Sequence, residues 1–124
     1  MKKIVIAEDQ AHIRRLIEQS LEELEEEGIE MIFAEDGEQA LALVHEQRPL
    51  LMLLDIMMPK LDGFEVCERI RLDPDTHLIH IIMLTAKGQE CDRTCGERSG
   101  ANQYLTKPFN PDVLLLTVRQ AIGL

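Results

Sequence analysis

The sequence has 124 residues, 45% of them hydrophobic, which is the size and composition of one folded domain rather than of a disordered chain. Its formal net charge is −10, which argues against direct contact with the phosphates of a nucleic acid. No apolar run approaches the ~20 residues of a membrane span, and the N-terminus lacks the apolar core of a signal peptide, so we expect a cytoplasmic protein without membrane contact.

Short apolar runs alternate with amphipathic stretches along the first half of the chain. Lys3–Ala7 is the first predicted strand, and one helical stripe over Ile13–Leu24 follows it and stops at Gly28. Ile29–Ala34 is the second predicted strand, and a helix is predicted over Gly37–Gln47. This order already favours strands that are joined by helices, as in a parallel sheet.

The middle of the chain continues the same alternation. Leu50–Leu54 is the most apolar run and predicts a central strand that is covered on both faces. After a loop over Asp55–Leu61, a helix is expected from about Asp62 to the Asp73-Pro74 pair, because the residue before a proline disfavours helix. Ile79–Leu84 is the fourth predicted strand.

The last third supplies a polar helix over Gly88–Ser99, a short strand over Gln103–Leu105 and a helix over Pro111–Ile122. In that last helix the run Leu114-Leu115-Leu116 exceeds one helix face, which leaves open whether part of it packs or forms a contact surface. Five strands alternating with five helices predict one doubly wound α/β domain over residues 1–124, with a parallel sheet between two layers of helices.

Polar side chains follow four of the predicted strands, and ligands of doubly wound sheets bind beyond the carboxyl ends of strands. Glu8 and Asp9 follow the first strand, Asp55 the third, Thr85 the fourth and Lys107 the fifth. Three carboxylates packed together repel one another, and a hard divalent cation relieves that repulsion. The pattern therefore predicts a Mg²⁺ site, with Asp9 and Asp55 as direct ligands and Glu8 bound directly or through water.

This set of groups suits phosphoryl transfer. A metal ion and the ammonium of Lys107 together neutralise a transferring phosphoryl group, so a carboxylate oxygen of Asp55 can act as the nucleophile and form an aspartyl phosphate. The hydroxyl of Thr85 can donate to a phosphoryl oxygen. Taken singly, each residue is as easily a helix cap, a turn residue or a solvated side chain; their coincidence at four strand ends favours a site.

The chain resembles the receiver domain of two-component response regulators. The resemblance covers about Lys2–Ile122 and rests on IVIAED at 4–9, LMLLDIMMPKLDGFE at 51–65, IIMLTAKG at 81–88 and ANQYLTKPF at 101–109. It implies a flavodoxin-like (βα)5 sandwich whose five-stranded parallel sheet has the order 2-1-3-4-5. It also implies a phosphoacceptor that assists its own phosphorylation and dephosphorylation rather than an enzyme with a turned-over substrate.

The resemblance assigns roles to individual residues. Asp55 would be the phosphoacceptor, and Glu8, Asp9, Asp55 and the backbone carbonyl of Met57 would hold Mg²⁺, for which Mn²⁺ can substitute. Lys107 would contact the phosphoryl group, and its bond to Pro108 would be cis. Thr85 and Tyr104 would form the switch pair, Thr85 moving toward the phosphoryl group and Tyr104 turning inward behind it.

The resemblance also implies partners. The donor would be a phosphohistidine on a sensor histidine kinase or a phosphotransfer protein. The signal would leave through the region Gly88–Ile122 to a downstream protein or output domain, with homodimerisation on phosphorylation as a further alternative. The roles of Cys91 and Cys95, which are four residues apart, stay open between a ligand or redox pair and ordinary thiols.

Three other readings compete with this one. A phosphatase with an aspartate nucleophile needs a second acid two residues after Asp55, where the chain has Met57. A flavin-binding module needs a phosphate-binding loop after the first strand, where Glu8 and Asp9 would repel phosphate. A degenerate receiver that binds partners without phosphorylation would be expected to lack site residues that this chain has.

Overall fold

The computed structural model describes residues 2–86 and 100–123. Within them, five parallel strands form one sheet in the order β2-β1-β3-β4-β5, which confirms the expected doubly wound topology. The strands are β1 Lys3–Ala7, β2 Glu30–Ala34, β3 Leu51–Asp55, β4 His80–Ala86 and β5 Gln103–Lys107. All five strands begin at the same end of the sheet, which we call its amino end. They finish at the opposite end, which we call its carboxyl end.

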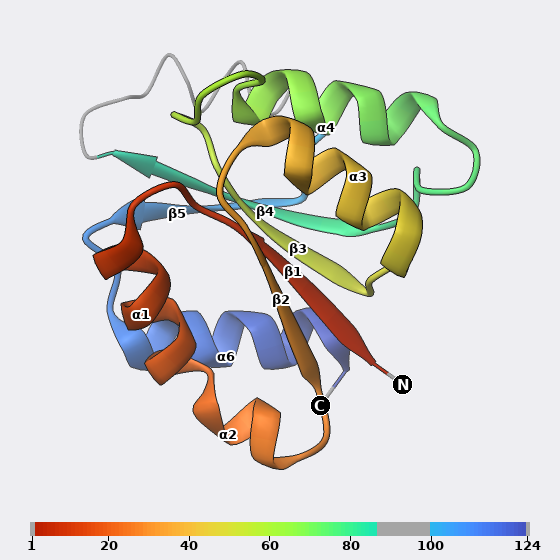
Figure 1. Ribbon diagram of the computed structural model, residues 1–124. Coiled ribbons are helices and arrows are strands. Elements are labelled where there is room, and N and C mark those ends of the chain that lie inside the picture. The colour runs from red at the N-terminus through yellow and green to blue at the C-terminus, as the bar shows by residue number, and fades with distance from the viewer. Residues whose placement is uncertain (1, 87–99, 124) are drawn as a thin grey trace.

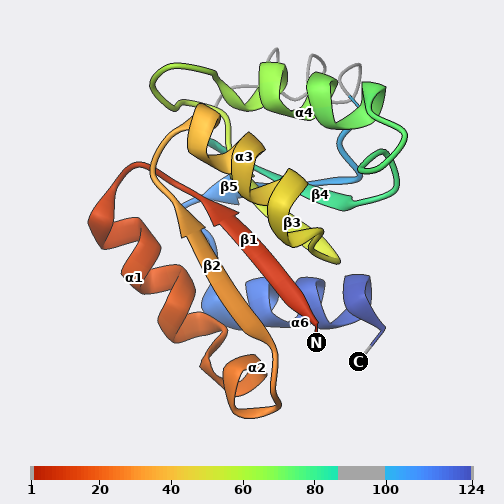
Figure 2. The same ribbon diagram turned by 45° about the vertical axis from the view of Figure 1, so that its right-hand side comes forward.

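Two layers of helices cover the sheet (Figure 1). The described helices are α1 Ala11–Ser20, α2 Glu22–Glu26, α3 Gly37–Gln47, α4 Gly63–Leu72 and α6 Pro111–Ile122. α3 and α4 lie on one face, and α1, α2 and α6 lie on the other, as the two views show (Figure 1 and Figure 2). The helix predicted over Gly88–Ser99 lies outside the described residues. No described helix has both the length and the apolar character that crossing a membrane requires.

The strands feed two separate hydrophobic cores because successive side chains of a strand point to opposite faces. Val5, Met52 and Ile81 pack toward α3 and α4, whereas their neighbours Ile4 and Leu51 pack toward α1 and α6. Every residue of β3 is buried, as expected for the central strand. A sheet covered on both faces leaves only its two ends for polar chemistry.

The single helix expected over Ile13–Leu24 is wrong, because the chain breaks at Leu21 into α1 and α2. The Ser20 hydroxyl donates to the carbonyl of Leu16 at 2.7 Å, a local bond that tends to bend helices. Leu21, with φ −106° and ψ 13°, then changes the chain direction, and both Leu21 and Leu24 are fully buried.

Three strands run further than the end of their apolar sequence. The predicted strands ended at Leu54, Leu84 and Leu105, but the parallel ladder continues to Asp55 in β3, Ala86 in β4 and Lys107 in β5. Backbone pairing does not depend on side-chain polarity, so Asp55, Thr85 and Lys107 lie in the ladder itself, whereas Glu8 and Asp9 follow the end of β1. The backbones of the three ladder residues are fixed before any ligand arrives.

Candidate functional site

Three carboxylates meet at the carboxyl end of the sheet. Glu8 and Asp9 come directly after β1, and Asp55 ends the neighbouring strand β3. One carboxylate oxygen of each lies within 4.8 Å of the others. Glu8 is completely buried and Asp55 is 4% exposed, whereas Asp9 is open to solvent. The sequence-predicted acidic residues are therefore brought together, with one open side.

Lys107 is the cation that faces this cluster. Its Nζ donates to Glu8 Oε1 at 2.7 Å and to Asp55 Oδ1 at 3.0 Å. The side chain starts from β5, which is separated from β3 by β4, so the long lysine stem spans the end of β4 to reach the acids. The peptide bond from Lys107 to Pro108 is cis, as the resemblance implies.

The charges of the cluster do not balance. Glu8, Asp9 and Asp55 bring three negative charges against the single positive charge of Lys107, so two negative charges remain. Burial raises the pKa of Glu8 and outweighs the hydrogen bond from Lys107, while the nearby Asp55 raises it further. Burial acts to lower the pKa of Lys107, but its two carboxylate partners raise it overall, so its charge persists.

A divalent cation fits this site. The three carboxylates offer the hard oxygen donors that Mg²⁺ prefers, and Mg²⁺ uses few carboxylates while keeping open positions for water or phosphate oxygens. Beside them lies a cavity of about 360 Å³ lined by Asp9, Gln10, Asp55, Met57 and Lys107. The surplus negative charge, the donor type and the adjacent open space all point to the same occupant.

The loop after β3 places Met57 at the rim of this cavity. The Met57 N–H donates to Asp55 Oδ1 at 3.4 Å, and the Met57 side chain is exposed. The loop returns tightly onto β3, because Gly63 N–H donates to the carbonyl of Ile56 at 2.9 Å. A Cβ at Gly63 would lie 2.7 Å from the carbonyl oxygen of Asp55, so only glycine allows helix α4 to start this close to Asp55.

The two residues of the expected switch pair lie on adjacent strands. Thr85 is buried at the end of β4, one residue beyond the partner of Asp55 in the ladder. Tyr104 pairs with Met83 in the β4–β5 ladder and is half-buried against the α3/α4 core, with its hydroxyl oxygen shielded from solvent. The role of Thr85 and Tyr104 as a switch pair and their movement on phosphorylation stay predictions.

Two residues that sequence reasoning missed hold the acidic segment in place. The Gln10 N–H donates to Glu8 Oε2 at 3.2 Å. Arg14, in the first turn of α1, donates from Nη1 to the backbone oxygen of Glu8 at 2.8 Å. The only sequence signal for Arg14 was its place five residues after Asp9, near the start of the predicted helix, a position that many exposed arginines also occupy.

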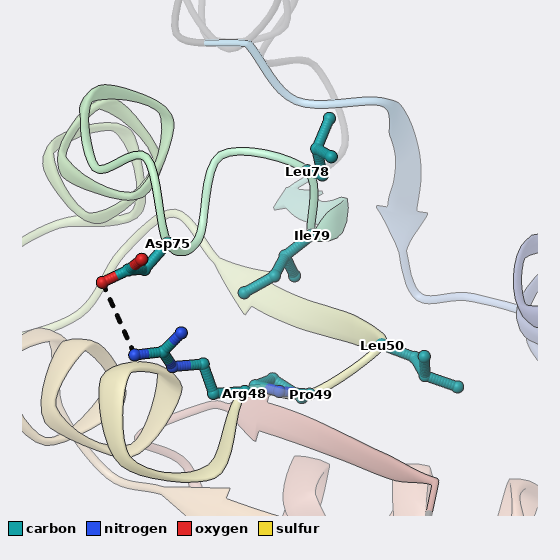
Figure 3. Close-up of a pocket in the computed structure, with 6 residues that line it drawn as sticks. All are labelled: Arg48, Pro49, Leu50, Asp75, Leu78 and Ile79. Atoms are coloured by element: carbon teal, nitrogen blue, oxygen red, sulfur yellow. Dashed lines mark hydrogen bonds and ion pairs between the residues drawn. The ribbon is translucent and has the colours of Figure 1, made fainter.

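A second hollow, of about 210 Å³, lies at the amino end of the sheet. Figure 3 shows Arg48 and Asp75 facing each other across one side of it at 3.5 Å, while Leu50 and Leu78 point away from that pair. One exposed ion pair with balanced charges offers no group for transfer chemistry. The hollow beside Asp55 is therefore the better candidate for a functional site.

Comparison with known proteins agrees with the geometry. Residues 4–119 match the model of the family described as "Response regulator receiver domain". The chain is 46% identical over 118 residues to the probable transcriptional regulator ycf27 of Galdieria sulphuraria, covering 95% of this chain and 44% of that protein. It is 43% identical over 110 residues to the alkaline phosphatase synthesis transcriptional regulatory protein PhoP of Bacillus subtilis, covering 89% of this chain and 44% of PhoP. The chain thus spans about half the length of the curated relatives it matches.

Solved structures show the same fold. The signal receiver domain of a DNA binding response regulator from Colwellia psychrerythraea superposes with a TM-score of 0.90 at 29% identity, covering 100% of both chains. The chemotaxis protein CheY4 of Vibrio cholerae superposes with a TM-score of 0.85 at 31% identity, covering 98% of both chains. With the acids and the lysine gathered at the carboxyl end of a 2-1-3-4-5 sheet, this chain belongs to the response regulator receiver domain family.

Proposed function

We propose that this chain is a phosphorylation switch in which Asp55 accepts a phosphoryl group from a phosphohistidine in a Mg²⁺-dependent reaction. The observation that carries the proposal is the shared lysine: Lys107 donates to both Glu8 and Asp55 beside a cavity that opens onto Asp9. The donor would be a sensor histidine kinase or a phosphotransfer protein acting in the cytoplasm.

The chemistry requires one bond to form and one to break. A carboxylate oxygen of Asp55 attacks phosphorus, the phosphorus–nitrogen bond of the donor breaks, and its electron pair returns to the imidazole nitrogen, which takes up a proton. A bound Mg²⁺, or Mn²⁺ in its place, would supply positive charge to the phosphoryl oxygens. Glu8, Asp9, Asp55 and the Met57 carbonyl would hold that ion. Lys107, already within 3.0 Å of Asp55, would bind a phosphoryl oxygen.

The new charge would act on the neighbouring strands. Thr85 and Tyr104, on β4 and β5, would change position as a pair and shift the population between two arrangements of the region Gly88–Ile122. Of that region, α6 presents Val113 at 48% and Leu116 at 56% exposure, while Leu114 is buried. This exposed apolar stripe would be the contact surface for a downstream protein, an output domain or a second copy.

The proposal is tested by incubating the purified chain with acetyl phosphate, with and without Mg²⁺, and measuring the intact mass. We expect addition of one phosphoryl group with Mg²⁺ only, and no addition in Asp55→Asn. Asp75→Asn is the matched control, because it makes the same change at an exposed position on the other end of the sheet. Equal phosphorylation of Asp55→Asn and the unaltered chain, or addition that ignores the metal, would contradict the proposal.

A further inference from the structure

Arg14 joins three segments around the acidic cluster. Its Nη1 donates to the backbone oxygen of Glu8 at 2.8 Å, and its Nη2 lies 3.4 Å from Glu35 Oε1 in the β2–α3 connection. The side chain is only 20% exposed although it belongs to the outer helix α1. A guanidinium suits such a junction, because its donors lie in one rigid plane and can bind a carbonyl oxygen and a carboxylate at once.

The carbonyl that accepts the hydrogen bond from Arg14 belongs to the peptide linking Glu8 to Asp9. Every other polar group of Glu8 is already held: its N–H donates to Ala34 O at 3.0 Å, and its carboxylate accepts from Lys107 and from the Gln10 N–H. Asp9, in contrast, is exposed, so the orientation of its side chain depends on the plane of the preceding peptide. Arg14 sets that plane through the Glu8 carbonyl.

We propose that Arg14 is a positioning residue for the metal ion. By fixing the Glu8–Asp9 peptide, it keeps the Asp9 carboxylate beside Glu8 and Asp55, where the three can hold one cation. This inference rests on the proposed function, since it assumes that the cluster binds Mg²⁺. It adds a residue from outside the acidic cluster and predicts how that residue affects metal affinity.

Charge and position predict opposite signs for the same substitution. Arg14 carries a positive charge near the cation, so its removal should tighten Mg²⁺ binding if charge alone matters. If Arg14 positions Asp9, its removal should weaken Mg²⁺ binding despite that favourable change in charge. The sign of the effect therefore separates a positioning role from a bystander charge, which a stability measurement alone would not do.

The test is Mg²⁺ titration of the unphosphorylated chain, followed by NMR shifts of backbone amides or by calorimetry. We expect Arg14→Gln to weaken Mg²⁺ binding about tenfold, the lower end of the usual effect of residues that orient metal ligands. Arg15→Gln is the matched control, because it removes the same charge from an exposed position of the same helix. For Arg15→Gln we expect unchanged or slightly tighter binding.

Arg14→Lys separates the guanidinium from its charge. An ammonium keeps the positive charge but lacks the planar pair of donors, so we expect Mg²⁺ binding weaker than in the unaltered chain. Thermal unfolding of each variant without metal shows whether it is folded, and Arg14→Lys decides the question if Arg14→Gln does not fold. Mg²⁺ binding by Arg14→Lys and Arg14→Gln as tight as or tighter than in the unaltered chain would overturn the inference. No Mg²⁺ binding by the unaltered chain would instead overturn the proposed function.

Discussion

The two ends of the sheet differ in how their charged side chains are compensated. At the carboxyl end, the buried Glu8 and Asp55 share the ammonium of Lys107, and the exposed Asp9 adds a third carboxylate beside them. Around the hollow at the amino end, Arg48 pairs with Asp75 at 3.5 Å, and the nearby Arg71 donates to the backbone carbonyls of His77 and Ile79. Surplus buried charge lowers stability unless a ligand relieves it. We infer that the side chains at the amino end stabilise the fold. The uncompensated charge at the carboxyl end lowers the free energy of unfolding, as is common where residues serve binding rather than stability.

Arg71 should show the largest effect on stability, because it holds the amino end together. Its guanidinium donates to the carbonyls of His77, Ile79 and Gly100 and to Asn102 Oδ1, at 2.6 to 2.8 Å. It thus ties the end of α4 to the start of β4 and to the segment before β5. We expect Arg71→Met to lower the free energy of unfolding by about 3 kcal/mol, since several charge-assisted hydrogen bonds are lost together. Urea unfolding measures this change.

Arg69→Met provides the control for that experiment. It removes the same charge from the same helix at an exposed position. We expect a change within about 0.5 kcal/mol, as for most surface substitutions. Similar losses for the two variants would show that Arg71 does not anchor the amino end and would break the comparison.

Asp55→Asn should raise the free energy of unfolding, by less than Arg71→Met lowers it. It removes one of the two surplus negative charges and keeps an oxygen that can accept from Lys107. We therefore expect the free energy of unfolding, measured in the presence of a chelator, to rise by on the order of 1 kcal/mol. Added Mg²⁺ should stabilise the unaltered chain more than this variant, since binding to the folded state adds to stability.

Glu68→Gln controls for the net charge of −10, because it neutralises an exposed acid on α4 that does not belong to the acidic cluster. A rise in stability as large as that of Asp55→Asn would assign the effect to overall self-repulsion rather than to the cluster. A fall in stability on Asp55→Asn would mean that the carboxyl end is balanced after all.

The chain order of apolar runs was enough to predict the sheet, because parallel strands buried on both faces require such runs. Leu51–Asp55 is the clearest example: all five residues are buried, and its last residue is the acid. The same logic placed Glu8, Asp55 and Lys107 at one edge, since parallel strands end together. Distances between their side-chain atoms, such as 2.7 Å from Lys107 Nζ to Glu8 Oε1, depend on the rotamers of both side chains, which a hydrophobic pattern does not specify.

The sequence did not predict the contacts of residues that fit several environments equally well. Arg14 and Arg71 look like ordinary surface arginines on predicted helices, yet each donates to a backbone carbonyl oxygen outside its own helix. The break at Leu21 was missed because a hydrophobic stripe records which residues are buried, not whether the helix axis bends between them. Tertiary contacts decide both features.

A pH-dependent pair at the amino end should give the smallest effect. Nδ1 of His45 faces the Leu41 carbonyl at 2.9 Å, and Nε2 faces Asp73 Oδ2 at 2.6 Å. Both neighbours are acceptors, so both ring nitrogens carry hydrogen when both bonds form. The Leu41 carbonyl, followed by Asp73, raises the pKa of His45 above 6.5 despite the charge of Arg48. The backbone N–H of Asp75, followed by His45, lowers the pKa of Asp73 below 3.8.

The signs of these shifts define a pH window. The His45 contribution to stability is fully present below pH 6.5 and is lost as pH rises through its raised pKa; the Asp73 contribution is present above pH 3.8 and is lost as pH falls through its lowered pKa. The side chains of His45 and Asp73 are 43% and 28% exposed, and solvent screens their interaction, so we expect His45→Gln to lower the melting temperature by only about 2 °C near pH 6, and by less near pH 9. His77→Gln is the matched control, because among described residues the structure places its Nδ1 against a carbonyl, that of Pro74, and not against a carboxylate. Equal pH dependence of the two variants would show that the His45–Asp73 pair contributes nothing to the stability of the amino end.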